Sequence, residues 1–203
     1  MAVVAEPETS VRARWRRLAT WLAPILLATA AGAQSAAPAK LVPAQSEITF
    51  QVKQSGVPID GRFRNFDAQL ALDPKAPQTG TVSITVDTGS ATVGFAESDA
   101  ELPRAPWFNS AKFPRAVFQS SAIKSLGGGH FQATGKLDLK GNPRDLVVPV
   151  TIVQSGPQST ATGEFIVKRL DYKIGENEWT DLSLVANDVR VRFKLVFTGL
   201  GPL

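Results

Sequence analysis

The chain has 203 residues, 43% of them hydrophobic and 20% charged, which suits a globular protein with one ordinary domain and an appendage. It contains no cysteine and a single histidine. This excludes disulfides, thiolate nucleophiles and Cys-ligated metal or iron–sulfur centres, and it argues against His-based metal sites and a Ser–His–Asp triad.

Residues 1–33 have the three parts of an export signal. Arginines at positions 12, 14, 16 and 17 form a basic region, residues 18–30 are apolar, and residues 31–33 (Ala-Gly-Ala) suit a cleavage site. The apolar run is short for a bilayer span and contains Pro24, which favours cleavage after Ala33 over a retained membrane anchor. We therefore predict a signal peptide over residues 1–33, the general secretory route and a periplasmic location.

The N-terminal segment also accounts for part of the formal net charge of +4. Cleavage removes four of the 22 basic and two of the 18 acidic residues, which leaves 18 and 16. A net charge of +2 does not predict a nucleic-acid partner.

Residues 34–40 form a small-residue linker, and residues 41–199 are predicted to be one β-rich domain. Alternation is clearest over residues 188–197, where five apolar side chains oppose Arg190, Arg192 and Lys194. Similar segments, separated by Gly- and Pro-containing turns, lie at residues 47–54, 59–73, 80–87, 115–126, 130–140, 144–152 and 159–170. About eight strands with short connections predict an all-β protein, an antiparallel barrel or sandwich.

One region, residues 94–114, interrupts this pattern. It lacks alternation and is rich in small, polar and proline residues, so a short helix or loop between strands is expected there.

The same alternation occurs in outer-membrane barrels with the faces exchanged. Those barrels carry two aromatic girdles, whereas this chain has one Tyr and, beyond residue 33, two Trp. The composition favours a soluble barrel over the membrane alternative.

No group of residues predicts catalysis. His130 follows three glycines and has no oriented partner nearby, so a surface or turn position is expected. Glu97, Asp99 and Glu101 are too closely spaced for a glycosidase pair and lack the calcium-loop pattern. The acidic segment at residues 171–181 also departs from that pattern, which favours a structural turn.

The interior of the barrel is therefore the candidate site. An eight-stranded barrel is either filled by side chains or holds one small apolar ligand. The predicted inward residues are Phe50, Phe63, Phe66, Phe118, Phe165, Val191, Phe193 and Leu195.

Several segments together resemble a known family. In order and spacing, "GRFRNF" (61–66), "WFNSAKFPRAVF" (107–118), "GKLDLKG" (135–141) and the alternating strand "VRVRFKLVF" (189–197) are similar to the YceI-like polyisoprenoid-binding proteins. The resemblance covers about residues 40–198.

The resemblance implies an exported lipocalin-like antiparallel barrel with a long apolar pocket for an isoprenoid chain, such as a quinone or polyprenyl lipid, and no cofactor. It places residues 94–114 near the mouth of the barrel, with Trp107, Phe108 and Phe113 bordering the pocket. The Trp-Phe form also resembles a branch found near cytochrome b561-type membrane proteins.

Two classes of function are thus weighed. The first is a carrier or sequestering protein for a long isoprenoid; the alternative is a non-catalytic periplasmic interaction or stress protein with a filled barrel, acting beside a membrane partner such as a cytochrome b561-type protein. An enzyme is the weakest hypothesis.

Overall fold

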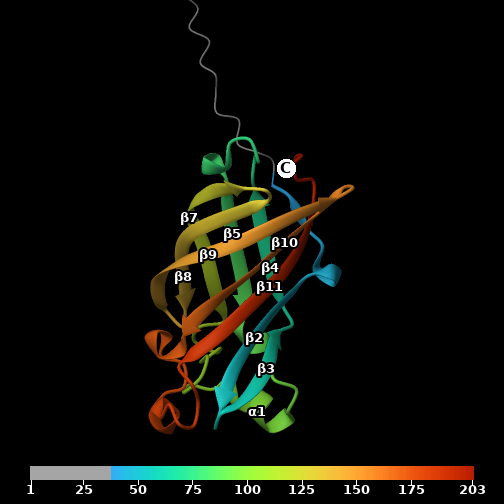
Figure 1. Ribbon diagram of the computed structural model, residues 1–203. Coiled ribbons are helices and arrows are strands. Elements are labelled where there is room, and N and C mark those ends of the chain that lie inside the picture. The colour runs from blue at the N-terminus through green and yellow to red at the C-terminus, as the bar shows by residue number, and fades with distance from the viewer. Residues whose placement is uncertain (1–37) are drawn as a thin grey trace, which may run out of the picture. The chain divides into compact units, whose positions relative to one another are not determined.

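The computed structural model describes residues 38–203 (Figure 1), so the predicted signal peptide and residues 34–37 of the predicted linker lie outside the described residues. Eleven strands occur within residues 38–203 and form one sheet. They are β1 (Lys40–Leu41), β2 (Glu47–Gln54), β3 (Val57–Phe63), β4 (Phe66–Ala71), β5 (Thr81–Asp87), β6 (Ala91–Thr92), β7 (Arg115–Gly127), β8 (His130–Leu139), β9 (Asn142–Ser155), β10 (Gln158–Lys168) and β11 (Asp188–Thr198).

All strand pairings are antiparallel, and the order across the sheet is β4-β5-β7-β8-β9-β10-β11-β2-β3-β6. The sheet curls around an apolar interior (Figure 1), which confirms the predicted all-β, lipocalin-like barrel. Nine strands, one more than predicted, have six or more residues. The extra strand arises because residues 59–73 contain a bend after Phe63 that separates β3 from β4. β4 begins the strand order, whereas β3 lies next to its last strand, β6.

The segment before β2 helps to close the barrel. Lys40 and Leu41 pair with β11, while Ala39 forms a bridge to Leu70 of β4. Ala39 is buried, and its backbone N–H donates to the Leu70 carbonyl at 2.7 Å. Residues 39 and 40, predicted to be linker, therefore belong to the wall of the barrel, where they connect β11 to β4.

The β8–β9 hairpin has a two-residue turn, because Leu139 pairs with Asn142. Lys140 and Gly141 both have positive φ, at 54° and 73°, as a type I′ turn requires. A side chain at position 141 would also be obstructed, because its Cβ would lie 2.7 Å from Cε1 of Phe113. Glycine at this turn therefore allows both the backbone conformation and the close packing of an aromatic ring.

The β9–β10 pairing covers only part of each strand. The register runs from Gln158–Ser155 to Thr162–Thr151 and then stops. The N-terminal part of β9 has no described partner on this side, and Pro143 and Pro149 lie there, where a missing N–H costs no ladder bond.

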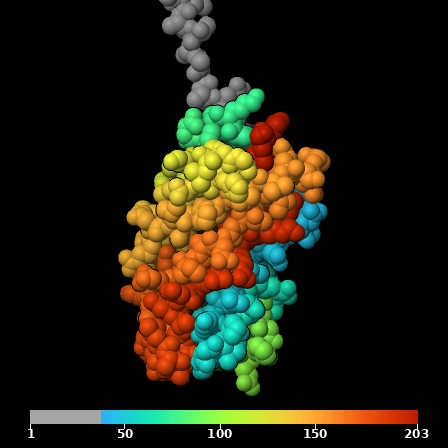
Figure 2. Space-filling view, in the orientation of Figure 1, coloured from blue at the N-terminus to red at the C-terminus, as the bar shows by residue number. Residues whose placement is uncertain are grey.

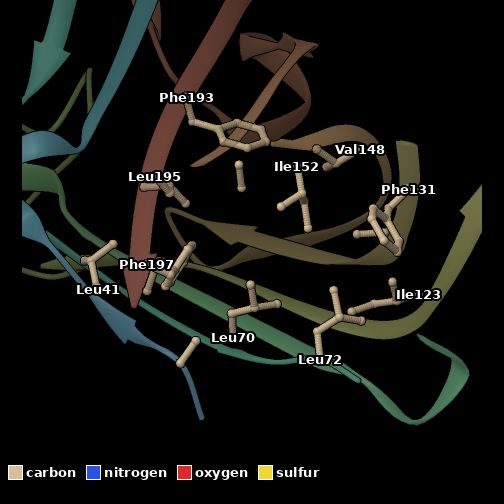
Figure 3. Close-up of a cluster of buried hydrophobic side chains, with 14 of the residues drawn as sticks. Leu41, Leu70, Leu72, Ile123, Phe131, Val148, Ile152, Phe193, Leu195 and Phe197 are labelled. Atoms are coloured by element: carbon tan, nitrogen blue, oxygen red, sulfur yellow. The ribbon is translucent and has the colours of Figure 1, made fainter. Parts of the chain in front are cut away.

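The interior holds two connected clusters of buried side chains. The larger one gathers inward residues of the alternating strands, including Phe131, Ile152 and Phe197 (Figure 3). The smaller one surrounds Phe108, Val167 and Ile174, near α1 and the loop between β10 and β11. These clusters mark the two ends of the barrel interior.

The expected interruption at residues 94–114 contains α1 (Ala96–Glu101), a helix of six residues followed by turns. Figures 1 and 2 show α1 at the same end of the barrel as the tip of the β2–β3 hairpin. The loop between β10 and β11, with short 3₁₀ turns at Arg169–Tyr172 and Asn177–Thr180, lies at that end too.

Candidate functional site

A cavity of about 330 Å³ lies inside the barrel. This volume is within the range for small-molecule sites. Its lining comes from the inward faces of the strands together with α1 and the β10–β11 loop, and it is overwhelmingly apolar. Alternation explains this composition, because every second residue of each strand points inward.

Most of the residues predicted from the sequence meet at this cavity. The lining includes Phe50, Phe63, Trp107, Phe108, Phe118, Phe165, Val191, Phe193 and Leu195. Several aromatic rings are in contact: the centroids of Phe50 and Phe63 are 5.3 Å apart, and those of Phe63 and Phe108 are 5.8 Å apart.

Two predicted residues, Phe66 and Phe113, do not line the cavity. Phe66, the first residue of β4, packs against the larger core cluster. Phe113 lies over Gly141 of the β8–β9 turn, with the Lys112 ammonium 5.3 Å from its ring centroid. The placement of Phe113 at the pocket border was therefore wrong, because the turn glycine offers a flat surface on which its ring packs.

The two ends of the cavity differ in exposure. At one end the lining side chains of Leu72, Ile123, Phe131 and Ile152 are 3–6% exposed. At the other end Phe95 is 63% exposed, and Gln54 and Ser98 are also exposed. We call the first the blind end and the second the mouth.

The cavity is elongated. Its lining on β8 extends from Phe131 to Leu139, and on β11 from Val189 to Phe197. Eight steps of about 3.3 Å give about 26 Å of strand, or roughly 20 Å along the axis of a barrel whose strands tilt by about 40°. This shape suits a chain-like molecule better than a compact one.

Sequence reasoning missed Arg169, which organises the loop at the mouth. Its side chain is 2% exposed and donates five hydrogen bonds to backbone carbonyls. The acceptors are the oxygens of Ala186 at 2.9 Å, Ile174 at 2.9 Å, Gly175 at 3.1 Å, Trp179 at 2.6 Å and Val185 at 2.6 Å. Every N–H of the guanidinium is thereby bonded, so this group holds the β10–β11 loop together from inside.

Gly175 permits this arrangement. A Cβ at position 175 would lie 2.3 Å from Nη1 of Arg169, and its φ is +78°. Burial lowers the pKa of the Arg169 guanidinium, which still stays protonated at neutral pH. Arg169 follows a strand in a polar stretch, and no spacing in the sequence indicated that it would be buried.

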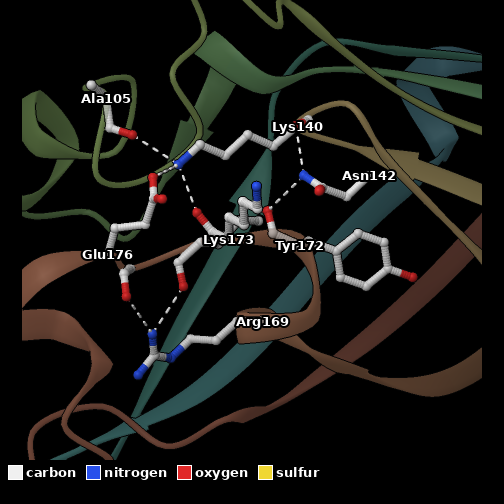
Figure 4. Close-up of polar contacts among 9 residues, drawn as sticks. Ala105, Lys140, Asn142, Arg169, Tyr172, Lys173 and Glu176 are labelled. Atoms are coloured by element: carbon white, nitrogen blue, oxygen red, sulfur yellow. Dashed lines mark hydrogen bonds and ion pairs between the residues drawn. The ribbon is translucent and has the colours of Figure 1, made fainter.

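Lys140 is a second buried cation near the mouth. Its side chain is 5% exposed, and Nζ donates to the carbonyls of Ala105 and Lys173 at 2.8 and 2.6 Å and to Oε2 of Glu176 at 2.8 Å (Figure 4). These bonds connect the β8–β9 turn to the segment after α1 and to the β10–β11 loop. A lysine beside a turn glycine is normally solvated, so its sequence gave no sign of this role.

The carboxylates on α1 are positioned individually. Asp99 accepts from the Thr92 hydroxyl at 2.5 Å and the Val93 N–H at 2.7 Å, and Arg64 lies 3.8 Å away. The Thr92 hydrogen bond, followed by that of Val93, lowers the pKa of Asp99. Glu101 lines the cavity and is paired with Arg104 at 2.8 Å. Glu97 is exposed, as expected for a solvated acidic face.

Comparison with known proteins places this geometry in a family. The model of the YceI-like domain matches residues 40–197. The chain belongs to the YceI-like family. Among solved structures, Burkholderia cenocepacia BcnA is similar with a TM-score of 0.75 and 36% identity, over 77% of this chain and 99% of that one.

Other similar proteins are less closely related to this chain. A UPF0312 protein of Azotobacter vinelandii is 31% identical over 110 residues, 54% of this chain and little more than half, 57%, of the relative. One from Shewanella baltica (strain OS185) is 29% identical over 159 residues, 72% of this chain and 83% of that protein. A polyisoprenoid-binding domain of Saccharophagus degradans, implicated in plant cell wall breakdown, shares the fold with a TM-score of 0.63 at 16% identity, over 81% of this chain and 99% of that one.

The remaining sequence predictions concern residues away from the cavity of this YceI-like barrel. His130 is exposed at the start of β8, with Nδ1 3.1 Å from the Thr151 hydroxyl, as expected for a surface position. The acidic segment 171–181 forms part of the β10–β11 loop. Within residues 38–203, no cluster of three or more His, Cys, Asp or Glu side chains is arranged to hold a metal ion. No helix in that range has the length and apolarity needed to cross a bilayer.

Proposed function

We propose that this protein binds the apolar chain of an isoprenoid, such as a quinone or polyprenyl lipid, in its barrel and carries or sequesters it without catalysis. The observation that carries the proposal is the elongated apolar cavity, closed at one end and open at the other. A fold neighbour, the Saccharophagus degradans domain, is described as polyisoprenoid-binding, which supports the same class of ligand. The alternative with a filled barrel requires a packed interior, so the cavity favours binding.

The cavity suggests an orientation for such a ligand. In the described part of the chain, the blind end offers no polar side chain, because it is lined by Leu72, Ile123, Phe131 and Ile152. The mouth, in contrast, is exposed to solvent. An apolar tail therefore enters first, and the polar head stays at the mouth.

Burial of the tail supplies the affinity. Each CH₂ transferred from water contributes about 0.8 kcal/mol. Part of this gain offsets the lost freedom of protein and ligand, which costs about 4–15 kcal/mol. Burying a tail of several isoprene units gains more free energy than the lower part of that cost. Affinity should therefore rise with each added unit until the cavity is full.

Lipid analysis tests this proposal directly. Protein expressed from the full sequence is examined by native mass spectrometry and by organic extraction, then delipidated and titrated with polyprenols of increasing length. We expect a co-purifying lipid and affinity that increases with chain length to a plateau. If neither lipid nor C20 polyprenol binds, the proposal is wrong.

Export to the periplasm is part of the proposal, and the predicted signal over residues 1–33 supports it. Fractionation of expressing cells should recover the protein in the periplasmic extract, with an N-terminus at residue 34. A chain that lacks residues 1–33 should remain in the cytoplasm.

A further inference from the structure

We propose that the mouth of the cavity selects ligands whose polar head is uncharged, and that Glu101 excludes anionic heads such as phosphates. This inference rests on the proposed function and assigns the head chemistry of the same site. It separates two ligand classes that the apolar tail alone does not distinguish, because polyprenols, quinones and polyprenyl phosphates can share the same tail.

The first step is the position of the polar groups. Among the described residues that line the cavity, charged, amide or hydroxyl side chains occur at Gln54, Ser98, Glu101 and Arg169. They come from the end of β2, from α1 and from the start of the β10–β11 loop, all at the mouth. The indoles of Trp107 and Trp179 lie at the same end, with ring centroids 5.3 Å apart. A ligand head is therefore read at the mouth.

Arg169 is the one cation among the described residues that line the cavity. Arg169 has five N–H groups, and all five donate to backbone carbonyls at 2.6–3.1 Å. A phosphate could bind this guanidinium only by displacing carbonyls that hold the loop. Arg169 is thus a structural cation and does not serve as an anion receptor.

Three further cations near the mouth, Arg64, Arg104 and Lys140, also have protein partners. Arg104 is bonded to Oε1 of Glu101 at 2.8 Å, and Arg64 lies against Thr92 and Asp99 at 3.0 and 3.8 Å. Lys140 has three oxygen acceptors. The helix α1 itself contributes three acidic residues and no basic one. Each of these cations already has a protein partner, and within residues 38–203 Glu101 is the one acidic residue in the lining of the cavity.

The chemistry follows from this arrangement. An anionic head at the mouth would approach Glu101 and lose water, and it would have to compete with Glu101 and Asp99 for the arginines that these carboxylates already pair. This is unfavourable near an apolar wall. A carbonyl or hydroxyl head instead finds the amide of Gln54 and the hydroxyl of Ser98, with which uncharged groups form ordinary hydrogen bonds. Glu101 is therefore a specificity residue, acting by charge and by restraining Arg104.

The test compares two probes with the same C20 tail, geranylgeraniol and geranylgeranyl monophosphate. Binding to the protein without its predicted signal peptide, residues 34–203, is followed by tryptophan fluorescence. The fluorescence then comes from the mouth, because Trp107 and Trp179 are the two tryptophans of this sequence. We expect the alcohol to bind at least tenfold more tightly than the phosphate. Failure of both probes would refute the proposed function, whereas equal or tighter binding of the phosphate would refute only the present inference.

Variants identify the residue responsible. Glu101→Gln removes the charge and releases Arg104, so the affinity for the phosphate should rise several-fold while that for the alcohol changes little. Glu97→Gln, a charge change on the same helix outside the lining, should leave both affinities unchanged. If Glu97→Gln shifts the phosphate affinity as much as Glu101→Gln does, the selectivity is a general surface-charge effect and the assignment of Glu101 is wrong.

Discussion

The blind end of the cavity and its mouth are stabilised by different interactions. At the blind end, buried apolar side chains of neighbouring strands pack against one another, as with Ile123, Phe131 and Ile152. At the mouth, two buried cations bind backbone carbonyls of irregular segments, Arg169 with five acceptors and Lys140 with two carbonyls and a carboxylate. Regular strands satisfy the hydrogen bonds of their own backbone, whereas a loop folded over a cavity needs donors from side chains.

The largest effect should come from removing the hub of the mouth. Arg169→Met keeps much of the side-chain volume and leaves buried carbonyls without donors, each of which costs about 1–3 kcal/mol. We expect the free energy of unfolding to fall by about 3–5 kcal/mol, after partial rescue by water. Urea denaturation followed by circular dichroism measures it.

Arg144→Met is the matched control. Arg144 is exposed and donates to the Asp171 carbonyl of the same loop through longer bonds of 3.3–3.4 Å. Its replacement should change stability by about 0.5 kcal/mol or less, the usual range for surface positions. Equal urea midpoints for the two variants would mean that the guanidinium of Arg169 does not hold the mouth.

The regular strands could be predicted from the sequence, whereas the side chains that hold the mouth could not. The strand of residues 188–197 and the hairpin of residues 130–152 follow from a period of two and from turn chemistry, and most of the inward aromatic residues follow from them. Arg169 and Lys140 could not be found in this way, because their partners are backbone carbonyls, which every residue carries. The position of Phe113 could not be predicted for a related reason. Its ring packs on the backbone of Gly141, which is distant in the sequence.

A smaller effect is expected at the second cation. Lys140→Met removes the donor to Ala105, Lys173 and Glu176, and we expect a loss of about 2 kcal/mol in the free energy of unfolding. The control is Lys136→Met on β8, the strand that leads into this turn. Lys136 is 66% exposed and is paired with Asp145 at 2.6 Å. That exposed pair contributes about 0–1 kcal/mol. A loss at Lys136 as large as at Lys140 would contradict the role assigned to burial.

Substitutions at the mouth are expected to change mainly the stability of the protein. A substitution at the blind end should instead change the affinity for the ligand more than the stability. Ala133→Phe places a ring into the cavity from β8, where Ala133 is 4% exposed and part of the lining. We expect binding of C20 polyprenol to weaken at least tenfold, measured by fluorescence titration, while stability falls by about 1 kcal/mol, the low end for added core volume.

Thr134→Phe adds the same ring at the next position, which is outside the cavity lining. Binding of C20 polyprenol should then match that of the parent protein. Were Ala133→Phe to bind this polyprenol as tightly as the parent does, the tail would not reach the blind end, and the proposed orientation would be wrong.

The smallest effect concerns the attachment of α1 to the mouth and depends on pH. The Thr92 and Val93 hydrogen bonds lower the pKa of Asp99 in the folded protein, so the ionised carboxylate stabilises the fold above its unfolded pKa, near 3.8. This contribution is lost as the pH falls through the lower, folded pKa. Asp99→Asn should therefore lower the urea midpoint at pH 7 and lose its effect in strong acid.

Asp99 accepts these two hydrogen bonds through separate carboxylate oxygens, whereas asparagine keeps a single acceptor oxygen. The pH profile separates the effect of the charge from this change in hydrogen-bond geometry, because only the charge depends on pH. A difference between parent and Asp99→Asn that disappears in acid shows that ionisation of Asp99 strengthens the attachment of α1. A difference that persists unchanged below the unfolded pKa would instead assign the effect to the amide itself, because the stabilisation that comes from ionisation shrinks as the pH falls below that pKa. In that case the mouth would depend on fixed hydrogen-bond geometry, as it does at Arg169, whose guanidinium stays charged at neutral pH.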